Sequence, residues 1–159
     1  MLVWSSIREE IPHAWLLSVD GSSNLNGNGA GIILEGPNDL LIEKSLRFEF
    51  KASNNQAEYE ALITGMNLVR EMGAENLRVR NDSQLITSQI TREYQTKDNQ
   101  LIKYLTKVQE LAKVFKFLEA IYVPREQNSR ANLLAKLAST KRPGNNRTII
   151  QEVVTFPST

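Results

Sequence analysis

The chain has 159 residues, of which 41% are hydrophobic and 23% are charged, a composition that allows one domain with a hydrophobic core. Its formal net charge of +1 gives no overall attraction to a polyanion, so nucleic-acid binding would need a local patch or bound metal. The absence of cysteine excludes disulfides and thiol catalysis, and a zinc site would depend on the single histidine, His13.

Residues 1–13 are expected to be irregular. They contain Arg8, Glu9 and Glu10 where a signal peptide would need an apolar centre, so we do not expect secretion. No apolar run approaches the length of a membrane span, and the protein is expected to be intracellular, either cytoplasmic or nuclear.

Three strands are predicted next. The segment from Trp15 to Asp20 is apolar on both faces, which is typical of a central strand, and Gly21 is expected to end it. Residues 29–35 predict a second strand after a turn rich in Gly and Asn. Residues 40–50 alternate apolar and polar side chains, which indicates a half-exposed antiparallel strand and hence a three-stranded meander. The exposed face of that strand would carry Leu41, Glu43, Ser45, Arg47 and Glu49.

The hydrophobic period then becomes helical. Ser53 and Gln56 fit a capping box, and the apolar residues that follow predict a helix that Gly73 ends. Residues 77–81 predict a short strand that leads to Asp82.

The rest of the chain predicts a brief helix over 83–91, a lysine-rich helix over 97–116, a strand over 116–123 and a last helix from near Asn128. The order β-β-β-α-β-α-α-β-α predicts an α/β fold with a five-stranded mixed sheet and helices on both faces. The predicted organisation is an irregular segment at 1–13, a domain at 14–140 and a tail or linker at 141–159.

Three acids and an amide could converge in this fold. Asp20 and Asp82 lie at the carboxyl ends of two strands, and parallel neighbours would point both into the crevice where open sheets bind ligands. Glu58 can lean toward that crevice from its helix, and Asn132 lies one turn into the last helix. Oxygen ligands without histidine suit Mg²⁺ or Mn²⁺. Two such ions about 4 Å apart can activate a water and stabilise the leaving oxygen in phosphodiester cleavage.

Each residue also has an ordinary structural explanation. An acid at a strand end is commonly a turn residue or a helix cap. Glu58 could be present because a negative charge near a helix N-terminus interacts favourably with the helix dipole, and Glu60 could equally be the functional acid. Asn54 and Asn55 are by default capping residues. The lysine-rich helix is by default a solvated face, so spacing alone leaves both interpretations open.

Five ordered segments resemble type 1 ribonuclease H: SVDGSSN, GAGIIL, SNNQAEYEALITGM, VRNDSQLI and VPREQNSRANLLAKLAS. From about Trp15 to Ser139 the chain most resembles the ribonuclease H domain of plant gypsy-class retrotransposon polyproteins. The segment KRPGNNRTIIQEV is similar to the connector toward the integrase. The resemblance implies a ribonuclease H-like fold and cleavage of the RNA strand of RNA/DNA hybrids with two Mg²⁺ ions, which Mn²⁺ can replace.

The resemblance also implies a metal-ligand set. Asp20, Glu58 and Asp82 match the family's first three acids, and Asn132 stands where a fourth aspartate is expected. Asp20 would bridge both ions, Glu58 and Asp82 would hold the ion near the leaving group, and the fourth ligand would hold the ion that carries the attacking water. An amide at Asn132 brings no negative charge, so we expect attenuated or abolished cleavage.

The substrate contacts implied by the resemblance involve Gly21, Ser22, Asn54, Asn55, Gln56 and Arg125. Asn54 and Asn55 match positions that contact the minor groove of the hybrid, where 2′-hydroxyls distinguish RNA from DNA. Main-chain groups of Gly21 and Ser22 would approach the RNA strand. Many members carry a histidine before the last helix, and Arg125 is the only candidate substitute in that loop.

Three functions therefore remain to be separated: an attenuated endonuclease, an inactive module that binds RNA/DNA hybrids or double-stranded RNA, and a purely structural domain. The three intact acids count against the last. The expected partner is an RNA/DNA hybrid, bound either by a monomeric isolated domain or by a polyprotein with reverse transcriptase and integrase. The sequence does not reveal whether Asn132 is natural or engineered.

Overall fold

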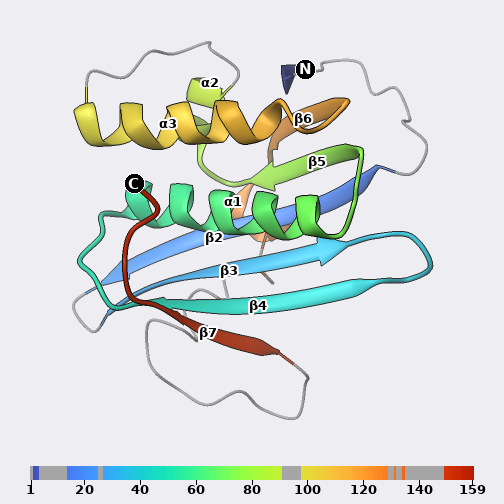
Figure 1. The fold of residues 1–159 in the computed structure, drawn as a ribbon. Helices are drawn as coiled ribbons and strands as arrows, with labels where there is room; N and C mark the ends of the chain where they lie inside the picture. Colours follow the sequence, from blue (N-terminus) through green and yellow to red (C-terminus); the bar gives the residue numbers. More distant parts are fainter. Residues whose placement is uncertain are drawn as a thin grey trace.

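The computed structural model describes residues 2–3, 14–24, 27–90, 98–128, 131, 134 and 149–159. They form one mixed sheet of seven strands with three helices in front of it (Figure 1). The strands are β1 (Leu2–Val3), β2 (Trp15–Asn24), β3 (Gly27–Glu35), β4 (Leu41–Phe48), β5 (Asn76–Asn81), β6 (Phe117–Tyr122) and β7 (Ile150–Val154). The helices are α1 (Asn54–Glu71), α2 (Gln84–Ile90), α3 (Asn99–Ala112) and the short 3₁₀ helix η1 (Arg125–Asn128).

The sheet order is β1-β6-β5-β2-β3-β4-β7. The predicted meander is confirmed, because β3 pairs antiparallel with both β2 and β4. The predicted parallel additions are confirmed as well, since β5 pairs with β2 and β6 with β5 in parallel. Thus all five predicted strands are present, and the sheet is mixed as expected.

Gly21 does not end its strand, contrary to the sequence prediction. It pairs with Ala30 of β3, and β2 continues to Asn24. A glycine in a strand interior commonly marks a close approach of another backbone, which is the case here and is described with the site below.

The prediction that β4 is half exposed is wrong. Glu43 and Ser45, on the face expected to be solvated, are both buried. The Ser45 hydroxyl donates to the main-chain oxygen of Leu134 at 2.7 Å, and Ala131 and Leu134 pack on the same side of the sheet against Ile33. Ala131 and Leu134 have helical backbone, so helical residues cover this second face. The remainder of the predicted last helix lies outside the described residues.

The main core lies between the sheet and the helices α1, α2 and α3. Helix α1 begins at the predicted capping box, in which the Ser53 hydroxyl accepts from the Gln56 amide and the Gln56 side chain accepts from the Ser53 amide. It ends before Gly73, whose φ of +81° is the left-handed conformation that stops a helix. Gly65 allows α1 to lie directly on Leu17 of β2, because an added Cβ would be 2.7 Å from that side chain.

Helix α3 is shorter than the predicted helix over 97–116. Asp98 caps its first turn by accepting from the amides of Gln100 and Leu101, and residues 113–116 form turns rather than helix. Among the described helices, none is long and apolar enough to span a bilayer.

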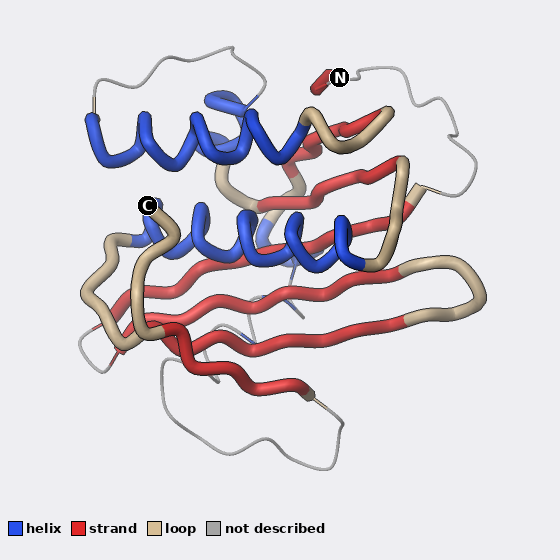
Figure 2. The backbone as a smooth tube through the Cα atoms, in the orientation of Figure 1, coloured by secondary structure: helices blue, strands red, loops and turns tan. Residues whose placement is uncertain are grey.

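The sheet has two strands that the sequence did not predict. In the segment expected to be irregular, Leu2–Val3 pairs with β6. In the segment expected to be a tail or linker, residues 150–154 form β7, parallel to β4, with an ion pair of 3.2 Å between Lys44 and Glu152. Residues 155–159 then turn toward α1, and the chain ends beside that helix (Figures 1 and 2).

Candidate metal centre

Two neighbouring parallel strands bring two of the predicted acids together. Val19 of β2 is paired with Asn81 of β5, so Asp20 and Asp82 follow at the same edge of the sheet. Glu58 reaches this edge from the second turn of α1. One carboxylate oxygen from each of Asp20, Glu58 and Asp82 lies within 4.8 Å of the others, which confirms the predicted convergence.

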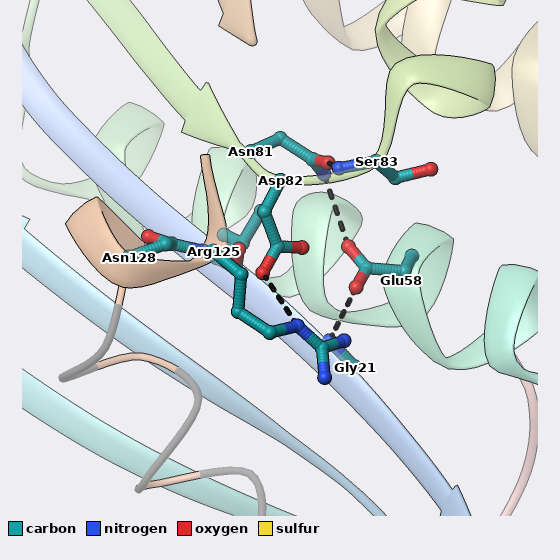
Figure 3. A network of polar contacts seen from close by, with 8 residues as sticks. Gly21, Glu58, Asn81, Asp82, Ser83, Arg125 and Asn128 are labelled. Carbon is teal, nitrogen blue, oxygen red and sulfur yellow. Dashed lines mark hydrogen bonds and ion pairs between the residues drawn. The ribbon is translucent and has the colours of Figure 1, made fainter. Parts of the chain in front are cut away.

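The Glu58 carboxylate is buried and held by two donors (Figure 3). The Gly21 amide donates to Oε1 at 2.9 Å, and the Asn81 side-chain amide donates to Oε2 at 3.0 Å. An added Cβ on Gly21 would lie 2.5 Å from the main chain of Ala57 and Glu58, so only glycine lets β2 approach α1 this closely.

Asn81 is a site residue that the sequence analysis missed. Leu77, Val79 and Asn81 alternate as the buried residues of β5, so an amide occupies a core-facing position. Its oxygen accepts from the Ser83 amide, and the Ser83 hydroxyl in turn accepts from the Ile86 amide at the start of α2. A polar residue at a core position of a strand is the signal that could have identified it.

Burial and mutual repulsion perturb the acids. Burial, followed by the neighbouring Asp20 carboxylate, raises the pKa of Glu58 well above its usual value. Burial and the charge of Asp20 also raise the pKa of Asp82 to about 6, while the Arg125 guanidinium acts to lower it. The cluster therefore retains protons that a divalent cation would displace.

Arg125 supplies the cation that lies nearest to Asp82 among the described side chains. Its Nε is 3.6 Å from Oδ2 of Asp82, although 68% of the Arg125 side chain is exposed (Figure 3). The short helix η1 that carries Arg125 is attached to the sheet by Asn128, whose buried amide donates to the Val19 carbonyl at 2.8 Å. Asn128 was also missed, and it positions η1 beside the acids.

The structure places the other predicted residues as follows. Asn54, Asn55 and Gln56 form the first turn of α1, on its solvent-accessible end, one turn before Glu58. Ser22 lies on β2 directly after Gly21. Asn132 lies outside the described residues.

Glu60, the alternative functional acid, does not belong to the acid cluster found among the described residues. Its buried carboxylate instead accepts hydrogen bonds from Tyr104 and from Ser158.

The donor set fits a hard divalent cation. Three carboxylates with no histidine among them are the ligands that Mg²⁺ and Mn²⁺ prefer. The raised pKa values of Glu58 and Asp82 come first from burial and then from the neighbouring Asp20 carboxylate, so the site holds its acids close together in a buried place.

Known proteins resemble this chain in sequence. Residues 18–138 match the family described as reverse transcriptase-like. The chain is 34% identical to Ribonuclease HI of Halobacterium salinarum over 114 residues. This alignment covers 72% of this chain and 52% of that relative. The chain thus spans about half the length of this curated relative.

Solved structures agree with the fold. RNase H1 of Halobacterium salinarum superposes with a TM-score of 0.73 at 31% identity over 79% of this chain and 96% of that chain. LC11-RNase H1, isolated from compost and solved in complex with an RNA/DNA hybrid, superposes with a TM-score of 0.72 at 27% identity over 80% of this chain and 97% of that chain. The sheet and helices described above therefore form a ribonuclease H-like fold.

Proposed function

The chain belongs to the family of ribonuclease H and reverse transcriptase-like domains, and we propose that it hydrolyses the RNA strand of RNA/DNA hybrids with divalent metal ions. The observation that carries this proposal is the convergence of Asp20, Glu58 and Asp82 where the parallel pairing of β2 with β5 ends. Sequence similarity to Ribonuclease HI and structural similarity to a relative solved with a hybrid support the substrate class.

Asp20, Glu58 and Asp82 would together hold two Mg²⁺ ions, or Mn²⁺ in their place. Bound ions supply Lewis-acid stabilisation of the leaving oxygen and lower the pKa of a water molecule. The chain's own residues orient the ligands. The Gly21 and Asn81 donors fix the two oxygens of Glu58, so this acid has little freedom to turn away.

Asn132 would be the fourth ligand. Its amide oxygen can coordinate a divalent ion but adds no negative charge, so we expect it to hold an ion more weakly than an aspartate would. The proposed activity is therefore attenuated.

The first turn of α1 would bind the hybrid. Asn54 and Asn55 lie at the accessible end of the helix that carries Glu58, about one turn before that acid. Contacts to 2′-hydroxyls at that turn would place the RNA strand, rather than the DNA strand, over the acids. Gln56 is already engaged in the capping box through its side chain, so it would contribute through its position in the first turn.

We also infer that the chain derives from a retroelement polyprotein, next to a reverse transcriptase and an integrase. The five ordered sequence segments that resemble gypsy-class retrotransposon ribonuclease H support this origin, as does the description of the matching family.

The test is cleavage of a labelled RNA/DNA hybrid in Mg²⁺ and in Mn²⁺, together with binding of the same hybrid. It compares the chain as written, Asn132→Asp, and Asn132→Asp combined with Glu58→Gln. The matched control combines Asn132→Asp with Glu110→Gln, which removes an exposed carboxylate from α3 instead.

We expect Asn132→Asp to cut the RNA strand strongly, the Glu58→Gln combination to be inactive, and the Glu110→Gln combination to match Asn132→Asp. Hybrid binding without cleavage by any variant would instead assign the chain to the inactive binding modules. Neither binding nor cleavage by any folded variant would identify a structural domain and overturn the proposal.

A further inference from the structure

A buried carboxylate outside the metal centre holds the last residues of the chain. Glu60 is 1% exposed, and it accepts three hydrogen bonds. The Tyr104 hydroxyl donates to Oε2 at 2.6 Å, and the Ser158 amide donates to the same oxygen at 2.8 Å. The Ser158 hydroxyl donates to Oε1 at 2.6 Å. Three donors thus converge on one buried side chain, which makes Glu60 an anchor for the segment that contains Ser158.

Residues 149–159, here called the C-terminal strap, run from the sheet edge to this anchor. Their first part is β7, paired with β4. The Val154 carbonyl then accepts from the Glu49 amide at 2.8 Å. The Ser158 carbonyl accepts from Lys107 Nζ of α3 at 3.0 Å. The C-terminal strap therefore bridges β4, the start of α1 and α3.

Apolar burial holds only part of the C-terminal strap. Ile149 and Val154 pack, partly buried, against core residues, but Ile150, Val153 and Phe156 are 47%, 55% and 77% exposed. Its ladder with β4 lies at the edge of the sheet, open to solvent on one side. A segment held by few apolar contacts opens locally at a lower free energy than the core. The two hydrogen bonds from Ser158 to the buried Glu60 carboxylate therefore add an anchor at the end of the segment farthest from β4.

We propose that the C-terminal strap is a conformational device that docks and undocks as a unit, and that Ser158 on Glu60 is its latch. The docked state ties down α1, since the strap contacts Glu49 just before the helix and Glu60 within it. Glu58 of the metal centre lies two residues from Glu60 in the same helix, so docking restrains the turn that presents this acid. The latch itself does not depend on the proposed nuclease function.

The test is amide hydrogen exchange of the full chain, followed by mass spectrometry. Ser158→Asp places a second carboxylate against Glu60 and should undock the C-terminal strap. The control Phe156→Asp adds the same charge two residues away, on a side chain that points to solvent. Ser158→Ala removes only the hydroxyl, and Ser158→Thr keeps it.

We expect Ser158→Asp to speed exchange over residues 150–158 by about tenfold or more, since bonds to a charged group contribute that much to local stability. Ser158→Ala should give a smaller increase, while Ser158→Thr and Phe156→Asp should match the unchanged chain. Exchange in β5 should not change, which would show that the fold is intact. Equal exchange in Ser158→Asp and Phe156→Asp, whether both fast or both slow, would overturn the proposal.

Discussion

Gly21 lies so close to α1 that an added Cβ would be 2.5 Å from the main chain of Ala57 and Glu58, and the same glycine donates its amide hydrogen to the Glu58 carboxylate. One residue thus sets both the distance between β2 and α1 and the orientation of a site acid. Strand β2, helix α1 and the acid cluster are therefore coupled at this residue, and we expect a substitution here to disturb Glu58 as well as the packing of the helix on the sheet.

Gly21→Ala should push β2 and α1 apart. The new methyl group would lie 2.5 Å from main-chain atoms of α1, which cannot give way as a flexible side chain could. We expect a loss of roughly 1–3 kcal/mol in the free energy of unfolding, the usual cost of overpacking, measured by urea denaturation. Hybrid cleavage in the Asn132→Asp background should fall with it.

Gly73→Ala is the control for that change. Gly73 has a positive φ but nothing within 4 Å of an added Cβ, so its replacement adds backbone strain without touching the site. It should lower stability and leave cleavage per folded molecule unchanged. Equal losses of cleavage in both variants would show that Gly21 acts only through stability.

Asn81→Ala should loosen Glu58. The substitution removes the buried donor to Oε2 of Glu58 and the partly buried acceptor for the Ser83 amide. We expect about 1–3 kcal/mol less stability, the usual cost of an unsatisfied buried polar group, measured by thermal unfolding. Divalent-ion affinity, measured by titration calorimetry, should fall as well. An unchanged affinity would mean that Gly21 alone positions the acid.

Stability should rise as the pH falls from 7 toward 5 without divalent ions. The pKa of Asp82 is raised from 3.8 to about 6 in the folded state, so the folded protein binds a proton more tightly than the unfolded chain. This contribution is complete below pH 3.8 and is lost as the pH rises through about 6. The raised pKa of Glu58 acts in the same direction.

The measurement is the melting temperature against pH for the unchanged chain and for Asp82→Asn, which cannot titrate. As the pH falls from 7 to 5, the melting temperature of the unchanged chain should rise by a few degrees relative to that of Asp82→Asn. Divalent ions should reverse the trend, because they bind the deprotonated acids. Parallel curves would contradict the perturbed pKa of Asp82.

Arg125→Gln should tighten divalent-ion binding at pH 8. The guanidinium lies 3.6 Å from Asp82 and competes with an incoming cation, although its exposure makes the competition weak. We expect an affinity gain of about two- to fivefold, the range that exposed ion pairs contribute, measured by calorimetry. Lys116→Gln removes an exposed charge from the far end of β6 and should not change affinity. A loss of affinity in Arg125→Gln would show that Arg125 helps to assemble the site.

The acid cluster could be predicted from sequence because neighbouring residues in the chain show which strand or helix carries each acid. Asp82 directly follows β5, and Asp20 lies in β2 just past Val19, the last residue of β2 that pairs with β5, so parallel pairing brings the two acids to one place. The capping box at Ser53 and the helix stop at Gly73 could be predicted for the same reason, since all the residues involved are near neighbours in the chain.

The parts that sequence did not predict depend on distant contacts. Gly21 looked like a strand end because its partner, the main chain of α1, is 36 and more residues away. Glu43 and Ser45 looked solvated because Leu134, which covers that face, comes much later in the chain. Residues 150–154 have no period-2 pattern, since both faces of β7 are largely exposed, and only their pairing with β4 makes them a strand.

The position of β7 has a consequence for solubility. The eight-residue strand β4 would otherwise present a long row of unpaired amides and carbonyls, a template on which another chain can add a strand. With β7 in place, the outermost strand is five residues long and carries Glu152, and the opposite edge is the two-residue strand β1. Short, charged outer strands discourage edge-to-edge aggregation. Undocking of residues 149–159 would thus expose the protein to self-association even where the core remains folded.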